Sequence, residues 1–116
     1  MTHRLRRPRG HKDDEVFLEH MLIAIEELEM FAQADLDDVR TIRAIERAFE
    51  ILGEAANNIS DEFAKEHDDI PWRKIVGMRN WVIHAYFGTD LQVMQDTIKQ
   101  DLPALRTQLE TVKAAL

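Results

Sequence analysis

The chain has 116 residues, of which 45% are hydrophobic and 32% charged, and it contains no cysteine. A chain of this length forms one domain, and its hydrophobic content excludes an intrinsically disordered protein. The absence of cysteine excludes disulfides, thiol catalysis and thiolate metal sites. The apolar runs are too short to cross a bilayer and no segment resembles a secretory signal, so we expect a cytoplasmic protein that does not contact membranes.

The formal net charge of −7 is unevenly distributed along the chain. Residues 1–12 contain five basic residues and no acidic residue, so residues 13–116 carry a formal charge of −12. We interpret residues 1–12 as a basic, flexible N-terminal segment and residues 13–116 as a helical domain. An acidic domain binds nucleic acids poorly over most of its surface, because neutralisation of phosphates dominates non-specific affinity. Any contact with RNA is therefore expected to be local, at the basic segment or in a focused cleft.

The spacing of apolar residues predicts two long helices and a short one in the first half of the chain. Asp13 and Asp14 mark the start of the first helix, because acidic residues favour a helix N-terminus. The acidic turn at residues 35–38 supplies N-caps for the second helix, which should end near residues 57–60, with a short helical turn over residues 61–66. The apolar stripes expected to face the core are Phe17, Met21, Ala24, Leu28 and Phe31, followed by Ile42, Ile45, Phe49, Leu52, Ala56 and Ile59.

A third long helix is predicted to begin at Pro71, because proline suits the first turn of a helix. Gly88 is a natural stop after Phe87, and Gly77 is a weak point at which this helix could bend.

The fourth long helix should begin at Thr89 or Asp90, and Pro103 should kink or restart it. Its apolar stripe is the most regular in the chain and consists of Leu91, Met94, Ile98, Leu102, Leu105, Leu109, Val112 and Leu116. No useful alternation typical of a β-strand is present. The predicted fold is an all-α, antiparallel bundle of four long helices plus a short one.

Residues 78–88 carry the polar groups that look most like a site. Within eight residues they place a guanidinium (Arg79), an amide (Asn80), an imidazole (His84) and a phenol (Tyr86) on an otherwise apolar segment. A metal-free phosphodiester-cleaving enzyme needs such groups, because a cation can hold the phosphate and an imidazole titrates near neutrality. From spacing alone, the arginine and the histidine are more simply explained as groups that cap carbonyls or pair with the many carboxylates of the chain.

If residues 78–87 are helical, Arg79 and His84 lie about 140° apart around the axis and roughly 7.5 Å apart along it. They would bracket a groove, so one helix alone gives an incomplete site. A two-fold dimer would bring two imidazoles, as base and acid, and two guanidiniums to one cleft. The reaction that fits is attack of a ribose 2′-hydroxyl on the adjacent phosphorus, which needs no metal or cofactor and acts on RNA but not DNA.

The segment from Arg79 to Tyr86 resembles the R-x4-H-x-Y signature of the HepT-like (DUF86) branch of HEPN proteins. The flanking words are also similar: Ile-Pro-Trp-Arg at residues 70–73, Tyr-Phe-Gly at 86–88 and Leu-Gly-Glu-Ala at 52–55. The similarity runs from about residue 14 to residue 109, which is nearly the whole domain.

This resemblance implies a HEPN-like fold and a homodimeric endoribonuclease, the toxin of a toxin–antitoxin pair. The resemblance also implies that Arg79 and His84 are the catalytic pair and that Asn80 is their polar companion. We expect Glu54 to support packing of the bundle. The implied partner is an MNT-type nucleotidyltransferase antitoxin that transfers AMP from ATP onto Tyr86. An adenylyl group beside the cleft would repel and block RNA. Neutralisation by tight binding instead of modification is left open.

A second interpretation is a catalytically silent helical dimer that binds and regulates the nucleotidyltransferase, which the acidic surface favours. The other histidines form no metal-ligand pattern and the acidic clusters lack EF-hand spacing, so we expect no metal site. No glycine-rich, phosphate-cradling loop is present, so we expect no ATP-dependent catalysis by this chain.

Overall fold

The computed structural model describes residues 11–80 and 91–116, and all regular structure in these ranges is helical. This confirms the predicted all-α fold class. The elements in chain order are α1 (His11–Phe31), α2 (Val39–Asn57), α3 (Asp61–Glu66), α4 (Trp72–Gly77), the 3₁₀ helix η1 (Met78–Asn80), α6 (Leu91–Asp96), the π-helix η2 (Thr97–Asp101) and α7 (Leu102–Ala114).

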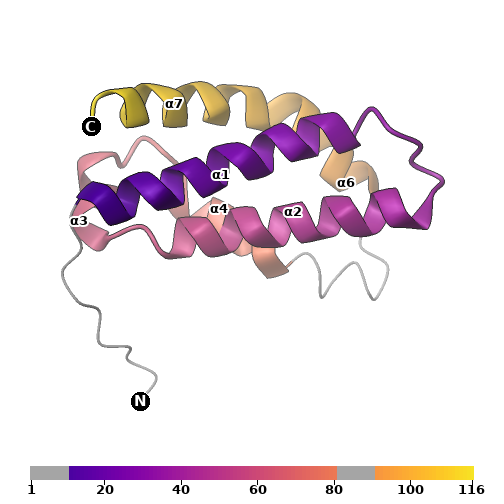
Figure 1. Ribbon diagram of the computed structural model, residues 1–116, viewed down its shortest axis with the longest axis horizontal. Helices are drawn as coiled ribbons and strands as arrows, with labels where there is room; N and C mark the ends of the chain where they lie inside the picture. The colour runs from indigo at the N-terminus through magenta and orange to yellow at the C-terminus, as the bar shows by residue number, and fades with distance from the viewer. Residues whose placement is uncertain (1–10, 81–90) are drawn as a thin grey trace, which may run out of the picture.

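The long helices are packed side by side in an antiparallel arrangement (Figure 1). α1 packs against α2 along one side and against α7 along the other, and both α2 and α7 run opposite to α1. α4 and η1 pack against α2, so the first residues of the candidate motif are supported by the C-terminal half of a long helix.

The core confirms the apolar stripes predicted for the three long helices. Burying such stripes against each other is what stabilises a helix bundle, because apolar area removed from water contributes roughly 25 cal/mol per Å². The exceptions are Ile42 and Leu91, which are partly buried outside the core cluster, and Leu116, which is 40% exposed beyond the end of α7. The side chains that are fully buried include Leu18, Met21, Ile25 and Leu28 of α1, Ile45, Phe49 and Leu52 of α2, and Leu102 and Leu109 of α7.

The start of α2 follows the predicted capping chemistry, and α3 has an N-cap that was not predicted from the sequence. Asp38 is the N-cap of α2 and accepts a hydrogen bond from the Arg40 backbone N–H at 2.8 Å. Hydrogen bonds from the Arg40 side chain, and secondarily from its backbone N–H, hold the pKa of Asp38 below its usual value. Ser60 is the N-cap of α3 and accepts a hydrogen bond from the Phe63 N–H at 3.2 Å.

The start of α1 differs from the prediction. The helix begins at His11, two residues before the predicted start, and Asp14 is buried. The Asp14 carboxylate accepts hydrogen bonds from the Ser60 backbone N–H at 2.8 Å and from the Ser60 hydroxyl at 2.7 Å. Asp14 therefore ties α1 to the start of α3, in addition to lying in an N-terminal turn.

The third predicted long helix also differs, within its described part. α-Helical structure ends at Gly77, and residues 78–80 form a 3₁₀ helix with a tighter repeat. The change of helix type falls directly after Gly77, the predicted weak point. The assumed α-helical spacing therefore does not apply to Arg79 and Asn80, and residues 81–87 of the predicted helix lie outside the described residues.

The last helix confirms the expected restart at Pro103. Its predicted caps, Thr89 and Asp90, lie outside the described residues, and α6 begins at Leu91. A π-helical turn follows, in which the Leu102 N–H donates to the Thr97 carbonyl. Pro103 then stands in the first turn of α7, where its missing N–H costs little.

Candidate active site

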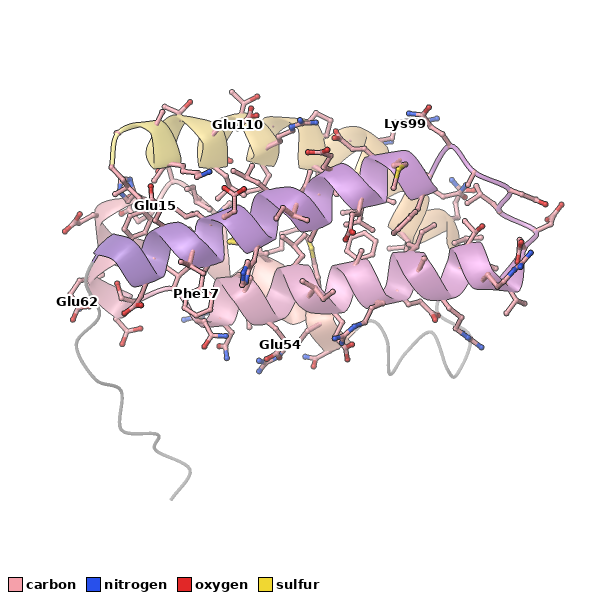
Figure 2. All side chains as sticks on the ribbon, viewed as in Figure 1. Glu15, Phe17, Glu54, Glu62, Lys99 and Glu110 are labelled. Atoms are coloured by element: carbon pink, nitrogen blue, oxygen red, sulfur yellow. The ribbon has the colours of Figure 1, made fainter. Side chains whose placement is uncertain are left out.

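Arg79 is the motif residue whose surroundings the structure shows most fully. It lies in η1, and its Nη1 donates a hydrogen bond to Oε1 of Glu54 on α2 at 2.8 Å. Its side chain is 34% exposed and that of Glu54 is 54% exposed, so the pair is at the surface with the arginine partly covered. Figure 2 shows Glu54 on the edge of α2 that faces away from α1 and α7. A cation is thus presented to solvent and held by a carboxylate 25 residues earlier in the chain.

Gly53 explains how η1 can lie so close to α2. A Cβ atom at this position would be 2.7 Å from the Arg79 backbone nitrogen, 2.8 Å from the Arg79 Cβ and 3.1 Å from the Val76 carbonyl oxygen. Real Cβ atoms do not approach a backbone this closely, so a larger residue would push η1 away from α2. The buried side chains of Ile75 and Met78 hold the same segment against the core.

Asn80 is exposed at the end of η1, next to Arg79. The structure therefore brings Arg79 to Glu54 at one edge of α2, with Asn80 next to Arg79 in the chain. The two other predicted site residues, His84 and Tyr86, lie outside the described residues.

Glu54 is a site neighbour to which the sequence assigns only a packing role. The word Leu-Gly-Glu-Ala at residues 52–55 belongs to the family resemblance, but nothing in its spacing indicates which cation the carboxylate meets. The signal that could have located it is the pairing of a glycine, which permits close approach, with an exposed acidic residue directly after it.

Other ion pairs lie along α2. Exposed pairs contribute about 0–1 kcal/mol each and are readily exchanged for other partners. The cation of such a pair can therefore bind a phosphate without a large loss of stability. The exposed pairs are Arg40 with Asp38 at 3.0 Å and Arg47 with Glu50, whereas the pair of Arg43 with Glu46 at 2.8 Å has a buried carboxylate.

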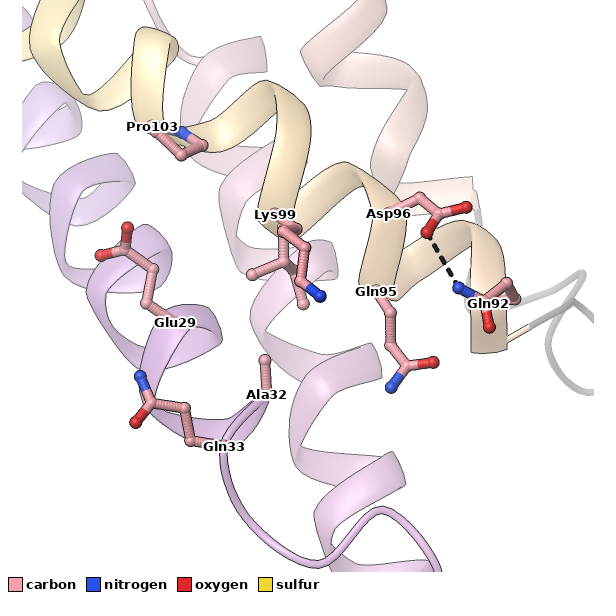
Figure 3. A pocket seen from close by; sticks show the side chains of 9 residues that line it. Glu29, Ala32, Gln33, Gln92, Gln95, Asp96, Lys99 and Pro103 are labelled. Atoms are coloured by element: carbon pink, nitrogen blue, oxygen red, sulfur yellow. Dashed lines mark hydrogen bonds between the residues drawn. The ribbon is translucent and has the colours of Figure 1, made fainter.

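A separate pocket of about 580 Å³ lies between the end of α1 and the segment from α6 to α7 (Figure 3). Gln92 donates to Asp96 at 2.8 Å along its rim, and Lys99 is its cationic side chain. Its described lining combines amides with unlike charges and contains no imidazole, so these residues offer no acid–base pair of the kind expected for the motif. It is lined by Glu29, Ala32, Gln33, Gln92, Gln95, Asp96, Ile98, Lys99 and Pro103.

Membrane-spanning segments and metal sites are both absent from the part of the chain that the structure describes. Within residues 11–80 and 91–116, no helix is long and apolar enough to cross a membrane. In the same two ranges, no group of three histidine or acidic side chains is placed to hold a metal ion.

The sequence is similar to a family of proteins and to several individual proteins. The family described as "Ribonuclease HepT-like" matches residues 21–112, a range that contains Glu54 and the whole motif. The chain is 42% identical over 110 residues to "Probable ribonuclease HepT" of Thermococcus cleftensis, which covers 90% of this chain and 97% of that protein. It is 37% identical over 102 residues to a "Putative RNase" of Caldanaerobacter subterraneus subsp. tengcongensis, covering 83% and 90% of the two chains. No solved structure gives a significant match.

Proposed function

Because this chain belongs to the HepT-like ribonuclease family, we propose that it is an endoribonuclease that cleaves RNA without a metal ion. The observation that carries the proposal is that Arg79, the first residue of the R-x4-H-x-Y motif, is partly exposed and held in place beside α2. A motif arginine that only capped or packed the bundle would have no need for a supported, solvent-facing position.

The proposed reaction assigns each motif residue a step. His84 removes the proton from a ribose 2′-hydroxyl, the 2′-oxygen bonds to the adjacent phosphorus, and the bond from phosphorus to the 5′-oxygen breaks. An imidazolium from a second His84 protonates the leaving oxygen, and Arg79 stabilises the charge on the non-bridging oxygens. Asn80 donates a further hydrogen bond to the phosphate. The products are a 2′,3′-cyclic phosphate and a 5′-hydroxyl end.

This assignment needs a homodimer in which two motif segments share one cleft. A two-fold interface repeats each group, so one polypeptide can supply both a base and an acid of the same residue type. RNA is then attracted by this cleft and by the basic residues 1–12, although the rest of the domain is acidic.

We further propose that the enzyme is the toxin of a toxin–antitoxin pair. Its partner is an MNT-type nucleotidyltransferase that transfers AMP from ATP to the Tyr86 phenol and releases pyrophosphate. The added phosphate charge and purine would stand two residues beyond His84 and exclude RNA. Intact-mass measurement after co-expression should show a gain of one AMP, and a Tyr86→Phe variant should not gain it. Gain of AMP by that variant would refute the assignment to Tyr86.

Cleavage of RNA in the presence of EDTA tests the proposed activity. The parent should generate cyclic-phosphate and 5′-hydroxyl ends, and the Arg79→Ala and His84→Ala variants should lose about two orders of magnitude or more in rate. Circular dichroism and urea unfolding should show that both variants fold. Equal cutting by parent and variants, or activity that requires a divalent ion, would contradict the proposal.

The second candidate is a silent dimer that docks and regulates the nucleotidyltransferase. It is favoured by the −12 charge of residues 13–116 and by the carboxylate that already neutralises Arg79. It predicts a tight complex with the transferase and no growth arrest when the chain is expressed alone. Growth arrest that disappears in the His84→Ala variant would exclude it.

A further inference from the structure

We propose that Glu54 is a positioning residue for Arg79, holding one side of the guanidinium so that its other side is presented to a phosphodiester. The inference rests on the proposed function and goes beyond the packing role expected from the sequence. Its basis is the contact of Arg79 Nη1 with Glu54 Oε1 at 2.8 Å, made at the surface of the molecule.

The shape of the guanidinium allows both contacts at once. It is planar and has five N–H donors in a fixed fork, so different edges can bind different partners. The pair with Glu54 uses Nη1 and does not need Nη2 or Nε. Those two nitrogens form the edge that binds phosphate oxygens in a bidentate manner, which is the strongest geometry for this recognition.

Two separate contacts with α2 fix Arg79. Gly53 allows the Arg79 backbone to lie against α2, and Glu54, the next residue, holds the tip of the side chain. An arginine side chain that is free in solution loses rotamer entropy when it is ordered. Because Glu54 favours one arrangement of Arg79 before RNA binds, part of that cost no longer falls on RNA binding.

The charge of Glu54 acts against its positioning role. A carboxylate beside the guanidinium weakens the attraction of a phosphate, although water screens a side chain that is 54% exposed. The two effects can be separated chemically. Glutamine keeps an oxygen that accepts from Arg79 and removes the charge, whereas alanine removes both.

Comparison of Glu54→Gln with Glu54→Ala therefore tests the proposal, because the two variants have the same charge. We expect Glu54→Gln to retain the parent kcat and to lower KM for an RNA oligonucleotide. Glu54→Ala should lose about ten- to a hundredfold in kcat, as misplaced catalytic groups do. Glu50→Ala is the matched control. Glu50 lies one turn before Glu54 on α2 and pairs with Arg47 instead of Arg79, so this variant should keep the parent kcat. Equal kcat values for the glutamine and alanine variants, or faster cleavage by the alanine variant, would overturn the proposal.

Binding of an RNA that lacks the attacking 2′-hydroxyl separates this proposal from the proposed function. The Glu54→Gln variant should bind it at least about threefold more tightly than Glu54→Ala, because only the former keeps Arg79 ordered. If the parent cleaves no RNA, the proposed activity fails but this difference in Kd can still be measured. Equal Kd values for the two variants, with urea midpoints showing that both fold, would exclude a positioning role for Glu54.

Discussion

At Gly53, α2 and η1 approach so closely that no β-carbon fits between them. The nearest atoms to such a carbon are the backbone nitrogen and Cβ of Arg79, which cannot rotate away as the end of a long side chain could. A substitution here must therefore displace the Arg79 backbone or bend α2. At Gly77, in contrast, a β-carbon would meet no atom within 4 Å, so the space around this residue is open.

Gly53→Ala should therefore damage both stability and the site. We expect a loss of about 1–3 kcal/mol in the free energy of unfolding, typical of overpacking, measured by urea denaturation. The rate of RNA cleavage should fall by more than the fraction of protein that is unfolded, because Arg79 is also displaced in the folded protein. Gly77→Ala is the matched control, because a β-carbon there meets no other atom. Its free energy of unfolding should stay within about 1 kcal/mol of the parent value, and alanine changes it mainly by restricting the unfolded chain. A Gly53→Ala protein as stable and active as Gly77→Ala would contradict the role assigned to the close approach.

At the scale of elements, the buried contact of Asp14 with Ser60 joins two helix starts that are 46 residues apart in the chain. Ser60 both caps α3 and donates its hydroxyl and backbone N–H to Asp14. Both side chains are buried, so their hydrogen bonds cannot simply be replaced by water.

Removing this hydroxyl should cost more than removing an exposed cap. Ser60→Ala loses an N-cap worth about 1 kcal/mol and leaves Asp14 short of a partner, which costs a further 1–3 kcal/mol or so. Asp38→Ala, which removes the partly exposed cap of α2, should be less destabilising, because water can replace the lost hydrogen bonds. Urea unfolding of the two variants and the parent measures both values. The interpretation fails if Ser60→Ala is no more destabilising than Asp38→Ala.

The cap of α2 should also give a pH-dependent contribution to stability. Arg40 depresses the pKa of Asp38 in the folded state below the usual value of 3.8. A depressed folded-state pKa means that ionised Asp38 stabilises the fold above the unfolded-state value, and that this contribution is lost as the pH falls through the folded-state pKa. The urea midpoints of the parent and Asp38→Asn should therefore differ near neutral pH and converge in acid. A difference that persists unchanged at a pH well below 3.8 would refute this account.

At the scale of the whole molecule, the sequence predicted what depends on periodicity and on local capping. Apolar stripes located the long helices and their core, and residues such as Asp38 and Pro103 marked ends and restarts. The features it did not predict depend on pairs that are distant along the chain. Gly53 and Glu54 meet Arg79, and Asp14 meets Ser60, and no local pattern shows which residues will be neighbours. The same reason limits the site: the motif named Arg79 and Asn80, but not the carboxylate beside them.

The proposed dimer makes a prediction that a site within one protomer does not. If the two protomers share one cleft, mixing the Arg79→Ala and His84→Ala proteins should restore part of the activity. The cleft of a heterodimer keeps one Arg79 and one His84, whereas each variant homodimer lacks one of these residue types altogether. Random exchange of subunits gives heterodimers in about half of the dimers, and each would combine one intact Arg79 with one intact His84. The mixture, after unfolding and refolding together, should cleave RNA faster than either variant refolded alone. Parent protein treated in the same way controls for losses on refolding. A mixture that is no more active than the separate variants, although native mass spectrometry of the two distinguishable masses shows heterodimers, would exclude a cleft shared in this way.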